Sequence, residues 1–325
     1  MPTAMALLVG LKNVDPIAYN GWDGTNGCLG CELDVDNVAC ILRPLGYAIT
    51  TLKTTQATGD AVLRGLRSAA TKLKDGDIFV FYYSGHGGQM LDTNGDEADN
   101  QDETLVAYDR QINDDELGQA WLGLKSGVRV VMLSDSCNSG TNYKLIGGFG
   151  PPPFFPGVSR TVAAKMQAQM LHFGGCRDAG TSAGYQLGGA FTRALCNVWN
   201  GGAFSGNYRA FYDAIRAEVR KTETQEPQHS PYGPVTAQFQ NQRPFAVAAD
   251  SRTAAAAAPA RISIALTLIA PDLETAREVA RVHLGGCVLD GINNARSSDR
   301  GCSVSASGSA GSGGWSVGGG ISCTL

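Results

Sequence analysis

Two long apolar runs limit the fold more than any other feature of this 325-residue sequence. They span Asp77–Tyr83 (DIFVFYY) and Val128–Ser134 (VRVVMLS), and each is almost uninterrupted by polar side chains. A strand with water on one face alternates apolar and polar residues, whereas continuous apolar runs are typical of strands covered on both faces. The two runs therefore predict central strands of a mainly parallel sheet.

Amphipathic stretches between short apolar runs complete an α/β pattern. Further strands are predicted at Ala6–Gly10 and Ala48–Leu52, and helices at Asp34–Leu45, Gly59–Leu73, Asp114–Gly123, Gly189–Asn197 and Asn207–Lys221. This alternation indicates βαβ units. We expect them to form one large domain over residues 1–248.

A second, smaller segment follows an Ala-rich linker at residues 249–260. In the C-terminal segment 261–325, alternating Ile and Leu residues from Ile262 to Leu268 predict a strand, and Asp272–Leu284 predicts a helix. The Gly-rich stretch from Cys302 to Leu325 is compatible with a hairpin or with a disordered tail. We expect a small α+β segment.

Reactive residues follow both apolar runs. The first run leads into SGHGG, which contains His86, and the second leads into DSCNSG, which contains Cys137. Reactive groups collect at the carboxyl ends of central strands in an open parallel sheet, and we expect a glycine-flanked turn at each of these ends. A lone Cys is more often a small buried hydrophobe. The joint placement instead predicts a nucleophile and its histidine partner.

These motifs resemble those of the caspase-like cysteine peptidases, and within them most closely the metacaspases. His86 precedes Cys137 by 51 residues, near the interval of about 50 typical of caspases. True caspases carry a QAC-type motif at the nucleophile, where this chain has DSC. The resemblance covers roughly residues 4–245. It implies a caspase-like three-layer α/β/α sandwich.

The resemblance also implies a mechanism without a cofactor. The Cys137 thiolate would attack a peptide carbonyl, and His86 would act as general acid on the leaving amine. The family's oxyanion hole maps onto the backbone N–H groups of Gly87 and Cys137.

A pocket for basic side chains is implied by the same comparison. The metacaspase pattern places carboxylates at Asp34 and Asp135, with Cys31 and Ser84 at the other pocket positions. Two carboxylates would hold the guanidinium of a P1 Arg, or a P1 Lys, by charge-assisted hydrogen bonds. The substrates would then be proteins or peptides cut after Arg or Lys. Alternatively, Asp34 is a helix N-terminal charge and Asp135 is a turn former.

Calcium activation is a further implication of the resemblance, through Asp102, Asp114 and Asp115. Lys144 stands in the region where metacaspases usually carry another acid. The acidic stretch DTNGDEADNQDETL is not an EF-hand, because the bidentate Glu at the twelfth position is missing. The alternative is a solvated acidic loop.

Net charge and cysteine usage bear on the partners of the protein and on its cellular compartment. The net charge is −4 without clustered Lys or Arg, and no apolar run approaches the roughly 20 residues of a membrane span. We therefore expect no nucleic-acid or membrane partner. The odd number of nine cysteines predicts free thiols in the cytoplasm. Cys28 and Cys31 form a CxxC motif without a second ligand pair.

Three interpretations remain open at this point. The first is an active endopeptidase that cuts itself at Lys144, Arg160 or Lys165, in or beside the loop Ile146–Arg160. The second is a signal-gated effector of a prokaryotic stress or antiviral defence pathway, whose segment 261–325 binds a ligand or a partner. The third is an inactive caspase-like scaffold. The terminal segment could equally serve for dimerisation or capping.

Overall fold

A central sheet with strand order β2-β1-β3-β6-β7-β8 organises the first part of the chain. Its strands are β1 (Ala4–Gly10), β2 (Ala48–Lys53), β3 (Ile78–Leu91), β6 (Arg129–Cys137), β7 (Gln169–Gly174) and β8 (Gln228–Tyr232). All neighbours pair in parallel except β7 and β8, and β8 contains Pro231. The predicted, mostly parallel sheet is thereby confirmed.

This description comes from a computed structural model. It describes residues 2–25, 28–91, 101–137, 158–175, 188–221, 226–248, 261–268, 302–311 and 314–324. The predicted loop Ile146–Arg160 lies largely outside these residues, and Arg160 begins helix α4 (Arg160–Lys165). Of the predicted self-cleavage sites, Lys144 also lies outside them, whereas Lys165 ends α4.

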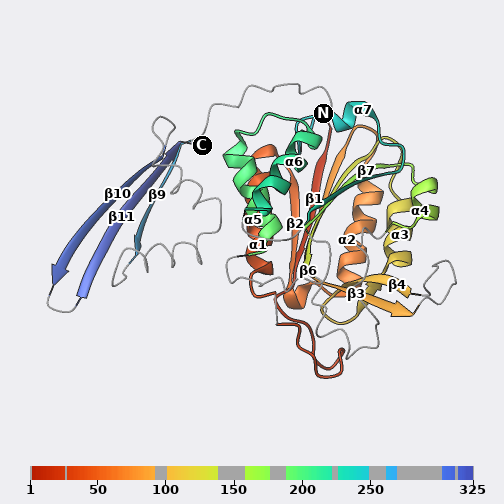
Figure 1. The fold of residues 1–325 in the computed structure, drawn as a ribbon, viewed down its shortest axis with the longest axis horizontal. Coiled ribbons are helices and arrows are strands. Elements are labelled where there is room, and N and C mark those ends of the chain that lie inside the picture. The colour runs from red at the N-terminus through yellow and green to blue at the C-terminus, as the bar shows by residue number, and fades with distance from the viewer. Residues whose placement is uncertain are drawn as a thin grey trace. The chain divides into compact units, whose positions relative to one another are not determined.

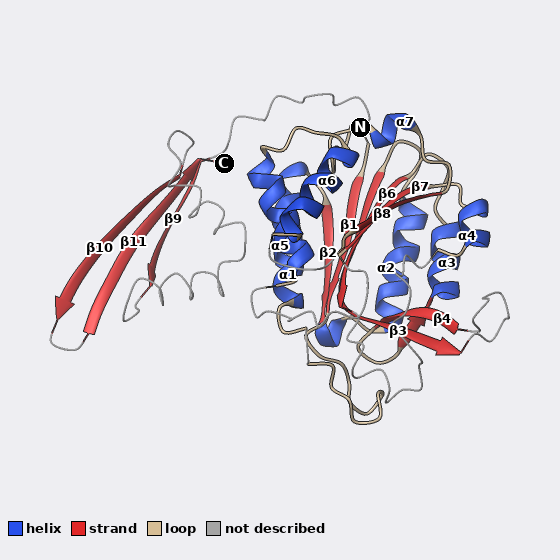
Figure 2. Ribbon diagram, viewed as in Figure 1, coloured by secondary structure: helices blue, strands red, loops and turns tan. Residues whose placement is uncertain are grey.

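Helices cover both faces of the sheet, as Figures 1 and 2 show. One layer contains α1 (Cys31–Leu42), α5 (Ala190–Trp199) and α6 (Tyr208–Val219), and the other contains α2 (Gly59–Lys72), α3 (Asp114–Leu122) and α4. Short elements complete the domain: 3-10 turns at Arg43–Leu45, Thr54–Gln56 and Asn200–Gly202, and α7 (Ala237–Gln240). The three-layer α/β/α prediction is confirmed.

Local sequence signals set several helix ends. The side chains of Thr58, Asn113 and Asn207 each accept a hydrogen bond from a backbone N–H in the first turn of α2, α3 and α6. The predicted helix Asp34–Leu45 begins earlier, at Cys31, and its last turn is the 3-10 turn that contains Pro44.

The apolar run of β3 is buried on both faces, as its composition predicts. Phe79, Phe81 and Tyr83 belong to the core that β3 shares with α2 and α3. Phe81 packs edge-on against Trp121 of α3, with ring centroids 5.6 Å apart. Tyr82 points the other way and contacts Thr192 of α5. Alternate side chains therefore anchor both helical layers to one strand.

The predicted turn at His86 is wrong, because β3 continues through it, whereas the residues that follow Cys137 lie outside the described part of the chain. β3 extends to Leu91, where its second half pairs antiparallel with β4 (Gln101–Val106), and β4 pairs with β5 (Gln111–Asn113). β6 extends to Cys137, so that His86 and Cys137 are register partners. Gly85 serves here for space rather than for a turn, because a Cβ atom would lie 2.6 Å from the Tyr83 hydroxyl.

A buried guanidinium lies at the amino-terminal end of the central strand β6. Arg129, at the start of β6, donates to the carbonyls of Gly76, Ala246 and Val247 and to the Gln242 side chain, at 2.6–3.0 Å. Its charge is thus surrounded by aligned acceptors from two distant parts of the chain. This arrangement fixes the last described residues of the domain.

The C-terminal strands form a separate three-stranded antiparallel sheet. Its order is β10-β11-β9, with β9 (Arg261–Leu268), β10 (Cys302–Gly311) and β11 (Gly314–Thr324). The predicted strand and the predicted Gly-rich hairpin are both present. The register places Val304 opposite Ile321 and Cys302 opposite Cys323. The predicted helix Asp272–Leu284 and the linker lie outside the described residues.

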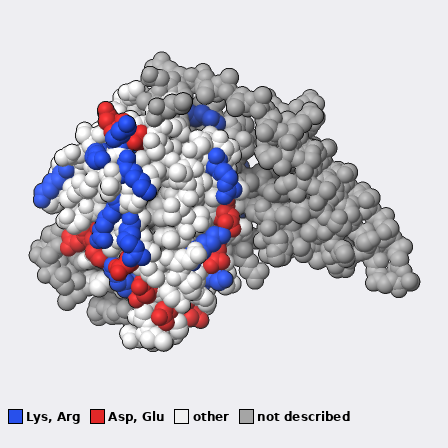
Figure 3. Space-filling model, turned by 180° about the vertical axis from the view of Figure 1, so that it is seen from behind, with Lys and Arg blue, Asp and Glu red and all other residues white. Residues whose placement is uncertain are grey.

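Charged side chains of both signs are mixed on the face shown in Figure 3. Surface ion pairs of the described residues include Arg209–Asp213 and Lys53–Asp36. No helix among these residues is both long enough and apolar enough to cross a membrane.

The buried His172 predicts a stability change with pH. It lies in the core, 2.9 Å from the Ser134 hydroxyl. Burial, with His229 as a smaller cause, lowers the pKa of His172 to about 3. The unfolded chain takes up this proton near pH 6.5 and the folded chain does not, so stability is lost as pH falls below about 6.5.

We expect the free energy of unfolding to fall by about 2 kcal/mol from this residue between pH 7 and pH 5. Urea denaturation of the parent and of His172→Asn at both pH values measures it. The Asn variant should lose about 2 kcal/mol less on acidification than the parent does. Equal losses in both proteins would contradict the assignment.

Candidate active site

His86 and Cys137 meet at the carboxyl edge of the sheet. They are register partners on the neighbouring strands β3 and β6, whose backbones lie about 4.8 Å apart in any such pair. Two residues earlier, Ser84 and Asp135 are also register partners. The pairing of two strands therefore brings together the predicted catalytic pair and half of the predicted pocket.

The His86 ring is held by a loop that the sequence did not single out. Nε2–H of His86 donates to the Gly24 carbonyl at 2.8 Å, and the Trp22 ring lies 4.9 Å from the imidazole. A carbonyl only accepts, so Nε2 carries the hydrogen of the neutral ring and Nδ1 is the nitrogen that can gain a proton. Burial lowers the pKa of His86, although the bond to Gly24 opposes this. The ring is therefore neutral near pH 7.

Tyr83 fixes the backbone of His86. Its hydroxyl lies 2.6 Å from the His86 carbonyl and 2.9 Å from the Val106 carbonyl, so its proton is shared between two acceptors. Val106 belongs to β4. The bond thus ties the histidine to the point where β3 leaves the central sheet.

Gly87, the predicted oxyanion donor, lies next to His86 in the part of β3 that pairs with β4. Leu105 is its register partner. Its role stays a prediction.

Two buried carboxylates lie beside this pair. Asp34 projects from the first turn of α1 and Asp135 from β6, and both are almost inaccessible to water. Burial, followed by the charge of Asp135, raises the pKa of Asp34 well above 3.8. Burial also raises the pKa of Asp135. Two carboxylates that share a dry site resist being charged together.

Hydrogen-bond donors from α5 and β3 compensate the two carboxylates. Asp34 accepts from the Ser84 hydroxyl at 2.9 Å and from the Gly189 N–H at 3.0 Å. Asp135 accepts from both the N–H and the hydroxyl of Thr192, at 2.8 and 2.7 Å. Gly189 and Thr192 flank the start of α5, where anionic groups are favoured.

These positions decide between the two interpretations of the carboxylates only in part. Asp34 does lie in a helix N-terminal turn, as the alternative proposed. Asp135 is not a turn former, because it lies within β6.

Cys31 completes the predicted group of four. It begins α1 and is buried, and its pKa is raised by a hydrogen bond with Cys28, by burial and by the charge of Asp34. Its carbonyl comes so close to β1 that a Cβ atom on Gly10 would lie 2.4 Å away. Cys31, Asp34, Ser84 and Asp135 are thus brought together. Cys28 and Cys31 are thiols and not a disulfide.

The predicted calcium residues are spread over two elements. Asp114 is buried at the start of α3, Asp115 follows it, and Asp102 lies in β4. Among the described side chains, no three His, Cys, Asp or Glu residues form a group suited to a metal ion. Calcium binding stays a prediction.

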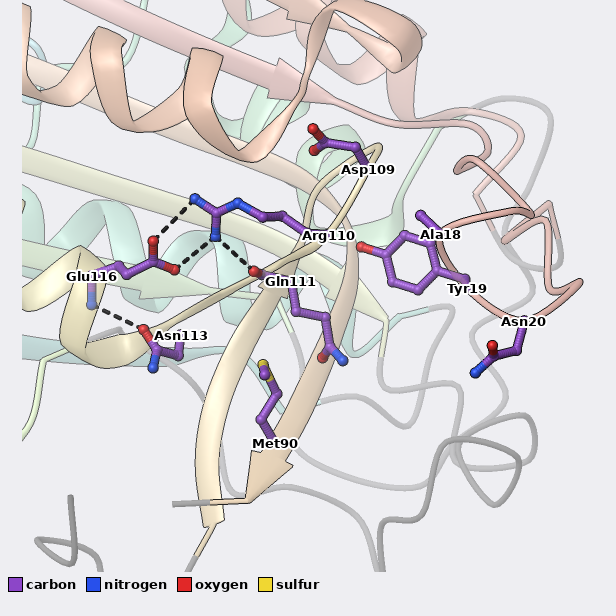
Figure 4. A pocket seen from close by; sticks show the side chains of 9 residues that line it. All are labelled: Ala18, Tyr19, Asn20, Met90, Asp109, Arg110, Gln111, Asn113 and Glu116. Carbon is purple, nitrogen blue, oxygen red and sulfur yellow. Dashed lines mark hydrogen bonds and ion pairs between the residues drawn. The ribbon is translucent and has the colours of Figure 1, made fainter. Parts of the chain in front are cut away.

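A cavity of about 360 Å³ lies near the loop that holds His86 but not at the catalytic pair. Tyr19, Met90, Arg110 and Glu116 are among its lining residues, which Figure 4 shows. Arg110 is already paired with Glu116 at 2.8 Å and with Asp60 at 3.2 Å. Arg110, the residue before β5, is therefore paired with both α2 and α3.

Comparison with known proteins agrees with this geometry. The Caspase domain family matches residues 3–239. Metacaspase-1 of Mycosarcoma maydis is 34% identical over 178 residues, 48% of this chain and 42% of that protein. Metacaspase-1 of Botryotinia fuckeliana is 34% identical over 156 residues, 43% of this chain and 35% of that protein.

A solved structure extends the comparison. The crystal structure of a protein from Geobacter sulfurreducens has a TM-score of 0.64 at 36% identity, and the match covers 76% of this chain and 99% of that one. The match to each of the two metacaspases spans less than half of that relative's length.

The approach of α5 to the carboxylates predicts the effect of one methyl group. A Cβ atom on Gly189 would lie 2.1 Å from Asp135 Oδ2, so Gly189→Ala must displace the carboxylate or the start of α5. We expect a loss of about 2 kcal/mol in the free energy of unfolding, measured by urea denaturation.

Gly123→Ala is the matched control, because the new Cβ atom meets nothing closer than 3.3 Å. We expect it to be close to neutral. Equal stability of the Gly189→Ala variant and the parent would show that this approach is not tight.

Proposed function

The chain belongs to the Caspase domain family, and from this premise we propose that it is a cysteine endopeptidase that cleaves proteins after Arg or Lys. One observation carries the proposal. Two buried carboxylates, Asp34 and Asp135, lie beside the paired backbone positions of His86 and Cys137. The first two groups would select the substrate, and the other two would perform the chemistry.

Proton transfer follows from the tautomer of His86. The imidazole is neutral at rest and carries its hydrogen on Nε2, facing Gly24. In the proposed reaction, Nδ1 accepts the Cys137 thiol proton as sulfur attacks the substrate carbonyl carbon. The imidazolium then donates that proton to the leaving amine nitrogen, and the C–N bond breaks. Water hydrolyses the remaining thioester in a second step.

The Gly24 carbonyl has a part in both steps. As His86 gains a proton, its positive charge is stabilised by a carbonyl that already faces Nε2. Trp22 covers the ring and limits its rotation. These contacts orient a base that burial would otherwise leave difficult to protonate.

The carboxylate pair supports the proposed preference for a basic P1 residue. A guanidinium placed between Asp34 and Asp135 would relieve their mutual repulsion and favour the charged form of both. An acidic P1 side chain would add a third negative group to a dry site. The proposed specificity is thus the opposite of aspartate cleavage.

Fluorogenic peptides with Arg, Lys, Asp or Asn at P1 test the proposal. We expect cleavage of the Arg and Lys peptides, and a loss of at least about a thousandfold in kcat for Cys137→Ala, since the nucleophile is removed. Preference for Asp would overturn the specificity, and undiminished turnover by Cys137→Ala would overturn the mechanism.

Charge removal within α1 tests the pocket itself. Asp34→Asn should raise KM for an Arg peptide about thirtyfold or more, because only the carboxylate of Asp135 is then left to pair with the guanidinium. Asp36→Asn is the matched control, because Asp36 is exposed on the same helix and pairs with Lys53. Equal KM values for the two variants would contradict the pocket.

In the parent, KM should rise as pH falls, because the raised pKa values of Asp34 and Asp135 let both protonate above the usual Asp range.

A further inference from the structure

Tyr82 places a hydroxyl group where a phenylalanine would satisfy packing alone. It is fully buried in β3, on the face opposite to Phe79, Phe81 and Tyr83. A buried hydroxyl is costly unless it finds a partner. One partner is Thr192 Oγ1, 2.7 Å away in the first turn of α5, and the Ser84 side chain is a second.

The direction of the hydrogen bonds can be assigned. Thr192 Oγ1 also lies 2.7 Å from Asp135 Oδ2. An ionised carboxylate only accepts, so the single Thr192 proton goes to Asp135, and Thr192 in turn accepts from Tyr82. The result is a relay, Tyr82 O–H to Thr192 O–H to Asp135, entirely inside the protein. The Thr192 backbone N–H, at 2.8 Å, adds a second donor to the same oxygen.

The relay acts on the carboxylate that accepts both of its described hydrogen bonds from one residue. Asp34 is held by Ser84 and Gly189, whereas both donors to Asp135 among the described residues belong to Thr192. The hydroxyl bond from Thr192 is the largest influence that opposes burial and lowers the pKa of Asp135, followed by its N–H bond and by Arg193. Among the described residues, the charged or titratable neighbours of Asp34 and Asp135 are Cys31 on α1, Tyr82 on β3 and Arg193 on α5.

We propose that Tyr82 and Thr192 are positioning residues that set the specificity for basic P1 side chains, by holding Asp135 ionised and in one orientation. The inference rests on the proposed function, because it takes Asp135 to be part of the pocket for the P1 side chain. Tyr82 and Thr192 themselves are not assigned any contact with the substrate. Thr192 orders the carboxylate directly, and Tyr82 orders the Thr192 hydroxyl. The effect of Tyr82 should therefore be the smaller of the two.

Hydroxyl deletions test the relay with Arg and Lys fluorogenic peptides. Thr192→Val keeps the shape and the backbone N–H, and it should raise KM about tenfold or more with kcat retained, because a hydrogen bond to a charged group is lost. Tyr82→Phe should raise KM about two- to fivefold. The acidic limb of kcat/KM should move to higher pH in both variants, and Thr192→Ser should restore the parent profile.

Two controls separate positioning from stability. Tyr47→Phe removes another buried hydroxyl, which donates to the Phe245 carbonyl, and it should leave KM and the pH profile unchanged. The rate of Cys137 alkylation by iodoacetamide, which needs no basic side chain, should be the same in the parent and in Thr192→Val.

The outcomes distinguish the relay from the proposed function. A parent enzyme that prefers Arg and Lys, with unchanged KM and pH profile in Thr192→Val and Tyr82→Phe, overturns the relay alone. A parent without basic preference overturns the pocket and the relay together. A lower melting temperature in the variants, without any kinetic shift, would show a purely structural role.

Discussion

The backbone register between β3 and β6 runs from Ile78 opposite Arg129 to His86 opposite Cys137. The positions of His86, Cys137, Ser84 and Asp135 relative to one another depend on this pairing. A slip of one residue would exchange the faces of the sheet and separate Ser84 from Asp135. The register is held along its length by large side chains buried on both faces of β3, so core packing and site geometry are set by the same contacts. The candidate site therefore begins on β3 directly after the last core residue, Tyr83.

Burying two like charges at this end of the sheet costs free energy, and the N-termini of two helices offset that cost. Asp34 lies in the first turn of α1, while Gly189 and Thr192 present the N-terminal N–H groups of α5 to the two carboxylates. Aligned dipoles and hydroxyls supply what water would supply at the surface. These donors are in place in the folded chain and favour the charged form of each carboxylate.

The sequence could predict the elements whose signal is local. The uninterrupted apolar runs identified β3 and β6, and polar residues at their ends identified His86 and Cys137. The positions of Asp34, Ser84, Asp135 and Cys31 followed from motif resemblance. The Gly24 carbonyl could not be predicted, because any residue supplies such an acceptor. Thr192 could not be assigned either, since an ordinary threonine gains its role only from the distant residues packed around it.

The continuation of β3 was missed for a related reason. Glycines at 85, 87 and 88 are usual turn signals, but here Gly85 makes room for the Tyr83 ring, and residues 87–91 pair with β4. A glycine chosen for space and one chosen for backbone freedom look the same in a sequence. Only the partner strand distinguishes them.

Pro231 has a consequence for assembly. It lies in β8, on the edge of the central sheet, opposite Leu171 of β7. Proline has no N–H, so this edge lacks one of the donors that an added strand would need. Sheet edges are templates for uncontrolled association between copies. β8 therefore gives the domain an edge that discourages extension of the sheet by a second chain.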